Sequence, residues 1–342
     1  MFWLAAFGVV HAHILLWRFD VLFYYAVAGM LLYPLRNITA KWLILLFVPV
    51  AMVIDVAQYQ YRMSSYRTAH QQHMQAVAAK QQGLELTAAQ TQAIGRWRVI
   101  ERLLLPSRTD AEEATRKLKG TYSSAASRVR PIARSWQTTL LPWLIWDSIA
   151  MMCLGMALFK TGFLSGTLAK MVYARIAVIG YGVGLPLALW RFHHEVFVVH
   201  SPTARLAFID SGAIDWTRSF LPIQRILIGL RHASIVILLF QAGILKALTR
   251  RLAAVGKMAL TTYLSYTIIC TLVFWGYGLN YYGELRYYQI YFVVLGIWMV
   301  ILLFSSIWLR YFRFGPLEWL WRTLTYSQLQ RLAKSPARLE VK

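Results

Sequence analysis

Long apolar runs alternate with shorter polar links along most of the chain. About 20 helical residues cross the hydrocarbon core of a bilayer, and a helix satisfies its own backbone hydrogen bonds where no water is present. The first apolar stretch, 2–35, divides into two short helices around a turn at 17–20. With the later runs we count about eight spans and predict an all-α fold, a polytopic transmembrane helical bundle. The later runs are 42–57, 140–159, 168–190, 223–245, 258–279 and 287–309.

The segment 59–138 breaks this pattern, because it is rich in Gln, Ala and Arg and contains no apolar run long enough to span. Thr87 with Gln90 and Thr109 with Glu112 fit capping boxes that start two helices. We expect a hydrophilic, partly helical insert, in which Gly120 and the serines after it form a turn and linker. The chain then divides into amino-terminal spans (1–58), a hydrophilic amphipathic loop (59–138) and a carboxyl-terminal membrane domain with an interfacial tail (139–342).

The first helix of this insert has an apolar face opposite three arginines, and the face consists of Ile94, Trp97, Ile100 and Leu104. A helix of this kind lies in a membrane interface or packs as a surface helix on the rest of the protein. In the span 168–190, Gly180 and Gly184 have the spacing of a close helix contact, and Pro186 predicts a kink.

Composition supports the membrane assignment, since 58% of the 342 residues are hydrophobic and the mean hydropathy is +0.48. The net charge of +22 comes from Lys and Arg that lie mainly between apolar runs and in the tail. Such residues set topology and contact anionic lipid. We therefore expect the lipid bilayer and anionic lipids as partners, and no nucleic acid. Cys153 and Cys270 lie inside apolar runs, which indicates neither a disulfide framework nor a metal site. The sequence does not predict an oligomeric state.

Basic residues around the last two apolar runs predict the orientation. Three precede the hairpin 258–309 and three follow it, so the carboxyl terminus is expected in the cytoplasm of a bacterium, with the bundle in the inner membrane. They are Arg250, Arg251 and Lys257, then Arg310, Arg313 and Arg322. Eight spans put the segment 59–138 outside, whereas a re-entrant early span would make it cytoplasmic, and its side stays open. The abrupt apolar start without a signal peptide leads us to expect further residues upstream.

Two blocks flank the hairpin, GKMALTTYL (256–264) and FRFGPLEWLWRTLTY (312–326). They resemble the signature blocks of the YeiB-like family of bacterial membrane proteins, whose carboxyl-terminal domain is called domain of unknown function 418. The stretches 151–164 and 11–32 resemble the family less closely. The family-motif residues are Gly256, Lys257, Gly315, Pro316, Glu318, Trp319, Trp321 and Arg322.

Two departures accompany the resemblance. Family members normally begin with further spans that carry an Asp-x-x-Arg-Gly motif, which this chain lacks, and Phe19 stands where a glycine is expected before an aspartate. The family distantly resembles membrane acyltransferases, so the resemblance implies a membrane-embedded acyl-group transferase or an inactive relative. Acyl-CoA would be its donor, and no other cofactor is evident.

His11, His13 and Asp20 are the candidate catalytic residues, because ionisable groups inside a membrane are rare and usually functional. A histidine oriented by a carboxylate can take a proton from an acceptor hydroxyl. The alternative is structural, with Asp20 paired to Arg18 at the turn.

Arg231 and His232 inside the span 223–245 are candidate substrate-binding residues, with hydrogen bonds to neighbouring helices as the alternative. His193, His194 and Glu195 lack the i, i+4 histidine pair of a metal site. Glu318 is expected to cap the positive end of its own short helix or to pair with Arg322.

Three functions therefore stay open: an acyltransferase or its relative, a small-solute transporter, and a non-catalytic membrane protein that binds lipid or a partner. The transporter alternative depends on the glycine- and proline-interrupted span and on the charged groups at depth. The sequence does not decide whether the protein is an enzyme.

Overall fold

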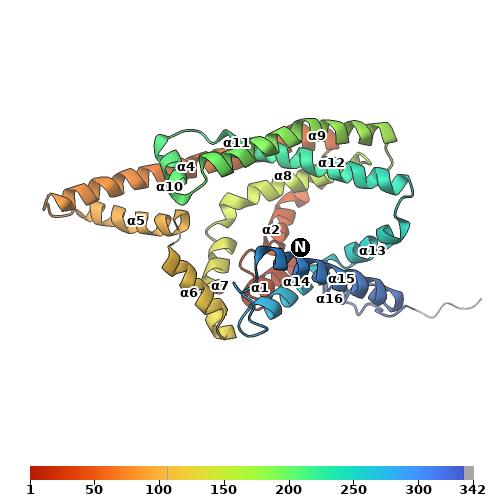
Figure 1. Ribbon diagram of the computed structural model, residues 1–342. Coiled ribbons are helices and arrows are strands. Elements are labelled where there is room, and N and C mark those ends of the chain that lie inside the picture. The colour runs from red at the N-terminus through yellow and green to blue at the C-terminus, as the bar shows by residue number, and fades with distance from the viewer. Residues whose placement is uncertain (106, 335–342) are drawn as a thin grey trace, which may run out of the picture. The chain divides into compact units, whose positions relative to one another are not determined.

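The computed structural model describes residues 1–105 and 107–334, and within them the chain is helical with no β-strand, which confirms the all-α class (Figure 1). The contacts between residues divide the chain into two compact units. Unit 1 consists of Met1–Tyr33, Glu113–Pro142 and Ala242–Lys342, and unit 2 consists of Pro34–Glu112 and Trp143–Gln241. Each unit is therefore assembled from segments that are far apart in the sequence.

Unit 1 brings the first helices of the chain against the last ones, because α1 packs on α2, α7 and α16 while α14 packs on α15 and α16. Its core includes Leu22, Leu260 and Leu264 with Trp321 packed against them. The helices are α1 (Phe2–His13), α2 (Leu22–Leu32), most of α6 (Arg108–Leu118), α7 (Tyr122–Gln137), α13 (Lys246–Lys257), α14 (Ala259–Phe274), α15 (Tyr287–Tyr311) and α16 (Pro316–Tyr326).

Unit 2 is organised around the pairs α9 with α12 and α4 with α5, and the first pair lies side by side over much of its length (Figure 1). The elements are η1 (Tyr33–Asn37), α3 (Ala40–Trp42), η2 (Leu43–Phe47), α4 (Val48–Gln81), α5 (Ala88–Leu104), α8 (Leu141–Lys160), α9 (Lys170–His193), η3 (His194–Val198), α10 (Pro202–Ser211), α11 (Trp216–Ser219) and α12 (Leu221–Gln241). Both η2 and η3 are single π-helical turns.

All eight predicted apolar runs are helical, but fewer than eight are long enough to span. Five helices of the described chain meet the length and hydropathy of a span: Ala40–Gln81, Leu141–Lys160, Lys170–Val198, Leu221–Gln241 and Tyr287–Tyr311. A sixth is possible if Lys246–Lys257 and Ala259–Phe274, which meet at a bend of 85°, count as one broken span. The expected count of about eight was high, because α1 and α2 have only 12 and 11 residues.

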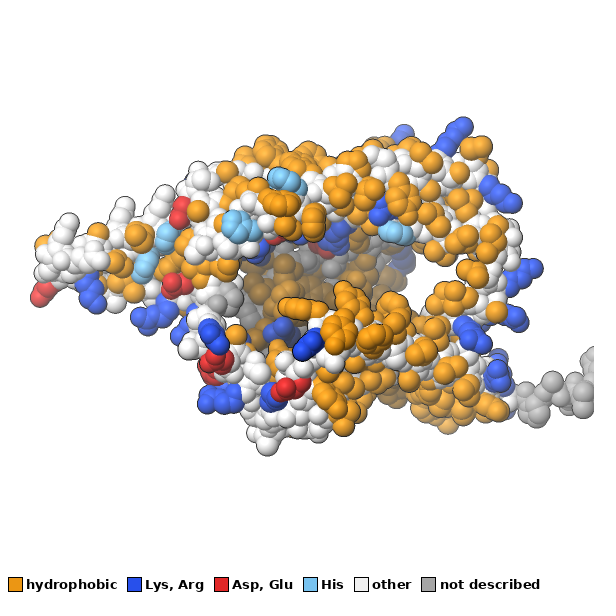
Figure 2. All heavy atoms as spheres, in the orientation of Figure 1, with side chains coloured by type: hydrophobic (Ala, Val, Ile, Leu, Met, Phe, Trp, Pro, Cys, Tyr) orange, Lys and Arg blue, Asp and Glu red, His pale blue; other side chains and the backbone are white. Residues whose placement is uncertain are grey.

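Hydrophobic side chains face outward over the long helices (Figure 2). On α15 alone the exposed residues include Phe292, Trp298, Met299, Val300 and Leu303. Contiguous apolar surface of this extent is typical of a face that contacts lipid. The chain is therefore a membrane protein, and contact with lipid follows from these surfaces.

Three local expectations have different outcomes. The capping box of Thr87 and Gln90 starts α5 as predicted. At α6 the reciprocal hydrogen bonds instead join Ser107 and Asp110, so the prediction for Thr109 was wrong by two residues. The stretch after Gly120 was predicted as a linker but forms α7, because its alanines and Val129 make a buried face against other helices of unit 1. Thr121 caps this helix by accepting from the Ser124 amide.

Candidate functional site

His11 lies at the centre of a buried chain of three polar side chains in unit 1. Its Nδ1 is 2.7 Å from Oδ1 of Asp20, and its Nε2 is 2.7 Å from Oγ1 of Thr267. The exposed fraction is 0% for His11 and 3% for Asp20. We call Asp20, His11 and Thr267 the buried relay. The structure thus brings together two of the three predicted catalytic residues and adds a threonine from α14.

Backbone geometry holds Asp20 in place. Its second carboxylate oxygen accepts a hydrogen bond from the Phe23 amide at 2.8 Å, at the start of α2. Gly8 on α1 permits this approach, because a Cβ atom there would lie 2.6 Å from Oδ2 of Asp20 and 2.6 Å from the Phe23 nitrogen. The aspartate is therefore fixed both by the helix it precedes and by the helix it faces.

Aromatic rings enclose the imidazole of His11. The ring of Tyr263 lies 4.9 Å from it, centroid to centroid, and the ring of Trp17 lies 6.3 Å away in a stacked orientation. These rings exclude water from the relay, which strengthens the hydrogen bonds within it.

The arrangement sets the tautomer of the histidine. A carboxylate accepts only, so the hydrogen bond to Asp20 assigns the ring proton to Nδ1 and leaves the lone pair on Nε2. Thr267 then donates its hydroxyl proton toward Nε2. A histidine oriented in this way can act as a general base toward a hydroxyl group, and it presents its basic nitrogen at the position that Thr267 now fills.

His13 does not belong to the relay, although it lies only two residues from His11. Its Nε2 is 3.0 Å from Oε1 of Gln137 on α7, and its carbonyl oxygen accepts from Nε of Arg130 at 3.0 Å. Among the described residues no ion pair joins Arg18 to Asp20, so the alternative pairing at the turn was wrong. Arg18 instead lies over the ring of Phe19, 4.7 Å from its centroid.

The two family blocks meet at Glu318 and Thr261. Oε1 of Glu318 accepts from the Thr261 amide at 2.9 Å, and Oε2 accepts from the Thr261 hydroxyl at 2.5 Å. The same hydroxyl oxygen accepts from the Leu317 amide at 3.1 Å. Glu318 therefore satisfies an amide in the first turn of α14 rather than one of its own helix α16, and its expected pairing with Arg322 gives way to this contact.

The other residues of these blocks shape the same corner. Gly256 and Lys257 end α13 directly before its bend into α14. Gly315 leaves room for the Glu318 carboxylate and the Thr261 hydroxyl, which a Cβ atom would overlap, and Pro316 opens α16. Further contacts fix the tail: Nε1 of Trp319 donates to the Gln330 carbonyl at 2.7 Å, Trp321 packs on the Leu22 cluster, and Arg322 lies 4.5 Å from the Phe314 ring centroid.

Arg231 and His232 lie in unit 2, within α12. Arg231 is 7% exposed, and its guanidinium lies 4.0 Å from the ring centroid of Tyr181 on α9. Its Nε and Nη1 atoms have no hydrogen-bond partner. His232 is exposed, and its Nδ1 is 2.8 Å from the carbonyl oxygen of Ile228, one turn earlier on the same helix. The two adjacent residues therefore occupy different environments.

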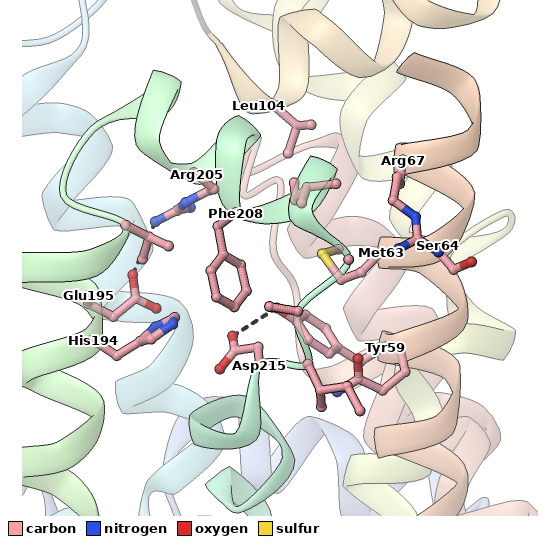
Figure 3. A pocket seen from close by; sticks show the side chains of 16 residues that line it. Tyr59, Met63, Ser64, Arg67, Leu104, His194, Glu195, Arg205, Phe208 and Asp215 are labelled. Atoms are coloured by element: carbon pink, nitrogen blue, oxygen red, sulfur yellow. Dashed lines mark hydrogen bonds and ion pairs between the residues drawn. The ribbon is translucent and has the colours of Figure 1, made fainter. Parts of the chain in front are cut away.

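A pocket of about 340 Å³ in unit 2, the Tyr59 pocket, brings together residues that the sequence did not connect (Figure 3). Glu195 pairs with Arg205 at 3.1 Å, and Asp215 accepts from the Tyr59 hydroxyl at 3.1 Å. Nδ1 of His194 is buried without a partner. Residues of α4, among them Tyr59 and Met63, line one side of the pocket, and His194 and Glu195 of η3 line the opposite side.

The sequence missed Thr267, Tyr263 and the Tyr59 pocket. The sequence does contain one signal for Thr267. Thr267 and Thr271 are spaced i, i+4 within an apolar helix, so they share a face of that helix. Both are buried. No local signal marks the pocket, because its walls come from four segments between residues 59 and 215.

Comparisons with known proteins identify a family for the chain. Residues 158–328 match the family described as "Protein of unknown function (DUF418)". The chain is 34% identical over 185 residues to the "Uncharacterized protein YeiB" of Escherichia coli (strain K12), which is 53% of this chain and 44% of that protein. It is 38% identical over 103 residues to the "Uncharacterized protein YxaH" of Bacillus subtilis (strain 168), or 30% of this chain and 26% of that protein.

A third relative is the "Uncharacterized 39.9 kDa protein in amylase 3'region" of Bacillus acidopullulyticus, with 39% identity over 97 residues. That alignment covers 28% of each chain. In each case this chain spans less than half the length of the curated relative. No solved structure matches the chain significantly. The match to the family includes Tyr263, Thr267 and the Glu318 contact but not His11 or Asp20, so the relay joins the family region to the first helices of the chain.

Proposed function

The chain belongs to the DUF418 family of YeiB-like membrane proteins, and from that premise we propose that it transfers an acyl group from a thioester donor to an acceptor hydroxyl at the buried relay. The observation that carries the proposal is the pair of 2.7 Å contacts that place His11 between a carboxylate and a hydroxyl. Asp20 orients the imidazole and stabilises the imidazolium that forms when Nε2 takes up a proton.

In the proposed reaction the acceptor hydroxyl takes the position of the Thr267 side chain. His11 Nε2 accepts the hydroxyl proton while the acceptor oxygen attacks the acyl carbonyl carbon. The carbon–sulfur bond of the donor then breaks, and the departing thiolate receives the proton from Nε2. The products are an ester and a free thiol, and acyl-CoA is a donor of the required class.

The orientation of the chain belongs to the same proposal. The carboxyl terminus lies in the cytoplasm of a bacterium, in the inner membrane, and cytoplasmic thioesters then reach the protein from that side. The basic residues Arg250, Arg251 and Arg310 around the last apolar run support this orientation.

The test measures transfer of radiolabel from [14C]acetyl-CoA into the lipid and carbohydrate fractions of membrane vesicles that carry the full chain. His11→Ala is expected to remove the transfer, and Asp20→Asn to reduce it about 10³-fold or more, because the wrong tautomer is then favoured. His13→Ala is the matched control, since His13 contacts Gln137 instead of the relay.

Thr267→Val separates two roles of the hydroxyl. If Thr267 only fills the acceptor position, the valine variant keeps its activity, whereas a covalent acyl-threonine would require the hydroxyl. Equal transfer by wild-type and His11→Ala vesicles would show that the relay does not perform this reaction.

A second candidate function, transport of an anionic solute, is favoured by one observation. The guanidinium of Arg231 is buried in the middle of a candidate span with two unpartnered nitrogen atoms, and ionisable groups at such depth commonly mark substrate paths. Proteoliposome uptake of labelled carboxylates that requires Arg231 but not His11 would support this candidate over acyl transfer. Salt-sensitive binding to anionic vesicles by a protein that shows neither transfer nor uptake would instead point to a lipid-binding role.

A further inference from the structure

A pocket of about 430 Å³ lies in unit 1 beside the turn that joins α1 to α2, and we call it the Trp17 pocket after a residue of that turn. Its other walls come from α6, α7, the end of α14, the segment that leads into α15 and the first turn of α15. The volume falls within the range of roughly 300–1,000 Å³ that is typical of small-molecule sites. All of its walls belong to one compact unit.

The interior of the Trp17 pocket is apolar. Phe19, Val129, Ile132, Phe274 and Trp275 contribute most of the side chains that an occupant would touch. Several of them are anchored in a buried cluster in which Leu118 and Trp275 pack with Leu16 and Val129. The hydrophobic effect therefore favours an occupant with an aliphatic body.

The charged side chains that line the Trp17 pocket are both positive. Arg18 and Arg128 are its only charged lining residues, and both are exposed. Within the described chain neither arginine forms an ion pair with a carboxylate. Arg18 contacts only the face of Phe19 through its guanidinium, so both guanidinium groups have donors free for an anion.

The carboxylates that adjoin lining residues in the sequence are held by other groups. Asp20 is bound by His11 and the Phe23 amide, and two glutamates are paired with lysines. Glu113 pairs with Lys117 at 2.8 Å, and Glu284 pairs with Lys119. The hydrogen bond from Lys117 holds the pKa of Glu113 below its usual range, and the more distant charge of Arg128 contributes in the same direction. The hydrogen bond from Lys119 likewise lowers the pKa of Glu284.

The turn that forms one wall is strained but firmly held. Leu16 is fully buried with φ of 58°, in the left-handed region that a leucine rarely adopts. The preceding carbonyl groups are fixed from α7: the Tyr122 hydroxyl donates to the Ile14 carbonyl at 2.8 Å, and Nε of Arg130 donates to the His13 carbonyl at 3.0 Å. Backbone strain of this kind is concentrated at functional sites and ligand clamps.

We propose that the Trp17 pocket binds a single-chain anionic amphiphile. The aliphatic chain lies among Phe19, Ile132 and Phe274, and the head group lies at Arg18 and Arg128. The volume accommodates one chain but not the two chains of a phospholipid. A carboxylate or a phosphate head group meets the same two guanidinium groups, so the fatty acids and the monoalkyl phosphates are the two chemical sources of this ligand.

The proposal concerns binding and does not depend on acyl transfer by the relay. Both sites nevertheless share the turn, since the ring of Trp17 stacks near His11 and Trp17 also lines the pocket. A bound amphiphile would therefore contact the support of the relay whether or not the relay is catalytic.

The test uses the purified full chain in nanodiscs of a zwitterionic phosphatidylcholine, with [14C]laurate and dodecyl phosphate as anionic probes and dodecyltrimethylammonium as the cationic competitor. We expect saturable binding of at least one anionic probe, with little competition from the cation. The probe that binds more tightly identifies the head group.

The double variant Arg18→Gln/Arg128→Gln is expected to weaken binding by about tenfold or more, which corresponds to two charge-assisted contacts of modest strength. Arg134→Gln is the matched control, because Arg134 is an exposed arginine of the same helix outside this pocket. Ile132→Trp, which fills the pocket, is expected to abolish binding.

The proposal is overturned if the cationic amphiphile competes as well as the anions, or if the double variant and Arg134→Gln bind alike. It is also overturned if neither anion saturates the wild-type protein. The arginine variants are at exposed positions and leave the buried core intact, so they decide the question even if the Ile132→Trp variant does not fold.

Discussion

Each unit contains buried polar side chains, but their surroundings differ. Unit 1 has the relay of His11, Asp20 and Thr267, and unit 2 has Arg231 and Ser234 on α12. In the relay, His11 and Asp20 have partners on every hydrogen-bonding side: a carboxylate, a hydroxyl and a backbone amide. In unit 2 the Nε and Nη1 atoms of Arg231 and the Oγ atom of Ser234 have none. The first group has the complete network of a positioned site, whereas the second has donors left for something the protein itself does not provide.

This difference has opposite energetic consequences. Removal of one partner from a satisfied buried network leaves another polar group unpaired, which is costly. Removal of a group that is already unpaired eliminates a desolvation penalty and is neutral or favourable. The relay residues and the unpartnered residues of α12 should therefore respond oppositely to the same kind of substitution, and the following variants test that expectation.

Asp20→Ala is expected to have the largest effect. It leaves Nδ1 of His11 and the Phe23 amide without an acceptor, and each buried donor that loses its partner costs about 1–3 kcal/mol. The measurement is the free energy of unfolding in detergent by denaturant titration. Arg18→Ala is the control at the same turn, because Arg18 is exposed and makes no hydrogen bond in the described structure. Equal stability of the two variants would contradict the role of Asp20 as the anchor of His11.

The next largest loss of stability is expected at the close contact of α9 with α12. Its size depends on which glycine of α9 is substituted. A Cβ atom at Gly180 would lie 2.7 Å from Cβ of Arg231 and 2.8 Å from the Leu227 carbonyl oxygen. Gly180→Ala should therefore destabilise the pair by about 1–3 kcal/mol through overpacking. Nothing lies within 4 Å of a Cβ at Gly182.

Gly182→Ala is thus a matched control on the same helix, and it should leave stability unchanged or raise it by up to about 1 kcal/mol through the better helix propensity of alanine. Thermal unfolding of the two variants under identical detergent conditions measures the difference. A Gly182→Ala protein that is less stable than Gly180→Ala would mean that α9 packs through another face.

Some parts of this architecture could be predicted from local patterns in the sequence. Hydrophobic runs located each candidate span because the bilayer imposes length and composition on each span locally. The spacing of Gly180 and Gly184 predicted a packing face, and both glycines are buried against α12. The sequence also selected His11 and Asp20, since ionisable groups in an apolar stretch stand out.

Partners across the fold could not be predicted in this way. Thr267 is 256 residues from His11, and only the packing of α1 near α14 brings the two together. Glu318 was expected to act within its own helix, but its partner Thr261 is 57 residues away. The Tyr59 pocket and the Trp17 pocket are likewise assembled from segments that are distant in the sequence. Neither hydrophobic periodicity nor a local motif predicts contacts between such segments.

Thr267→Val and Ser234→Ala compare the two units with changes of similar size. The valine leaves Nε2 of His11 without its partner and should destabilise the protein by about 1–3 kcal/mol. Ser234→Ala removes a buried hydroxyl that has no partner, so stability should stay the same or rise. Denaturant titration of both variants gives the comparison directly, and a larger loss for Ser234→Ala would reveal a partner for that hydroxyl in the membrane.

The smallest effect is expected at the exposed contact of Lys119 with Glu284. The hydrogen bond from Lys119, followed by its charge, lowers the pKa of Glu284. A lowered carboxyl pKa stabilises the folded state at pH values above the ordinary glutamate pKa, and this contribution disappears as the pH falls through the lowered value. Because solvent screens an exposed pair, the dependence of stability on pH should be shallow.

The measurement is the midpoint of thermal unfolding of wild type and of Glu284→Gln from neutral to acidic pH. The two midpoints should converge at the acidic end. In the same titration the unfolding midpoint of Asp20→Ala should lie well below that of wild type at neutral pH. The Asp20 carboxylate is buried and the Glu284 carboxylate is exposed, so solvent screens only the second. Curves for Glu284→Gln and wild type that stay parallel down to acidic pH would show that the Lys119 contact contributes nothing to folding.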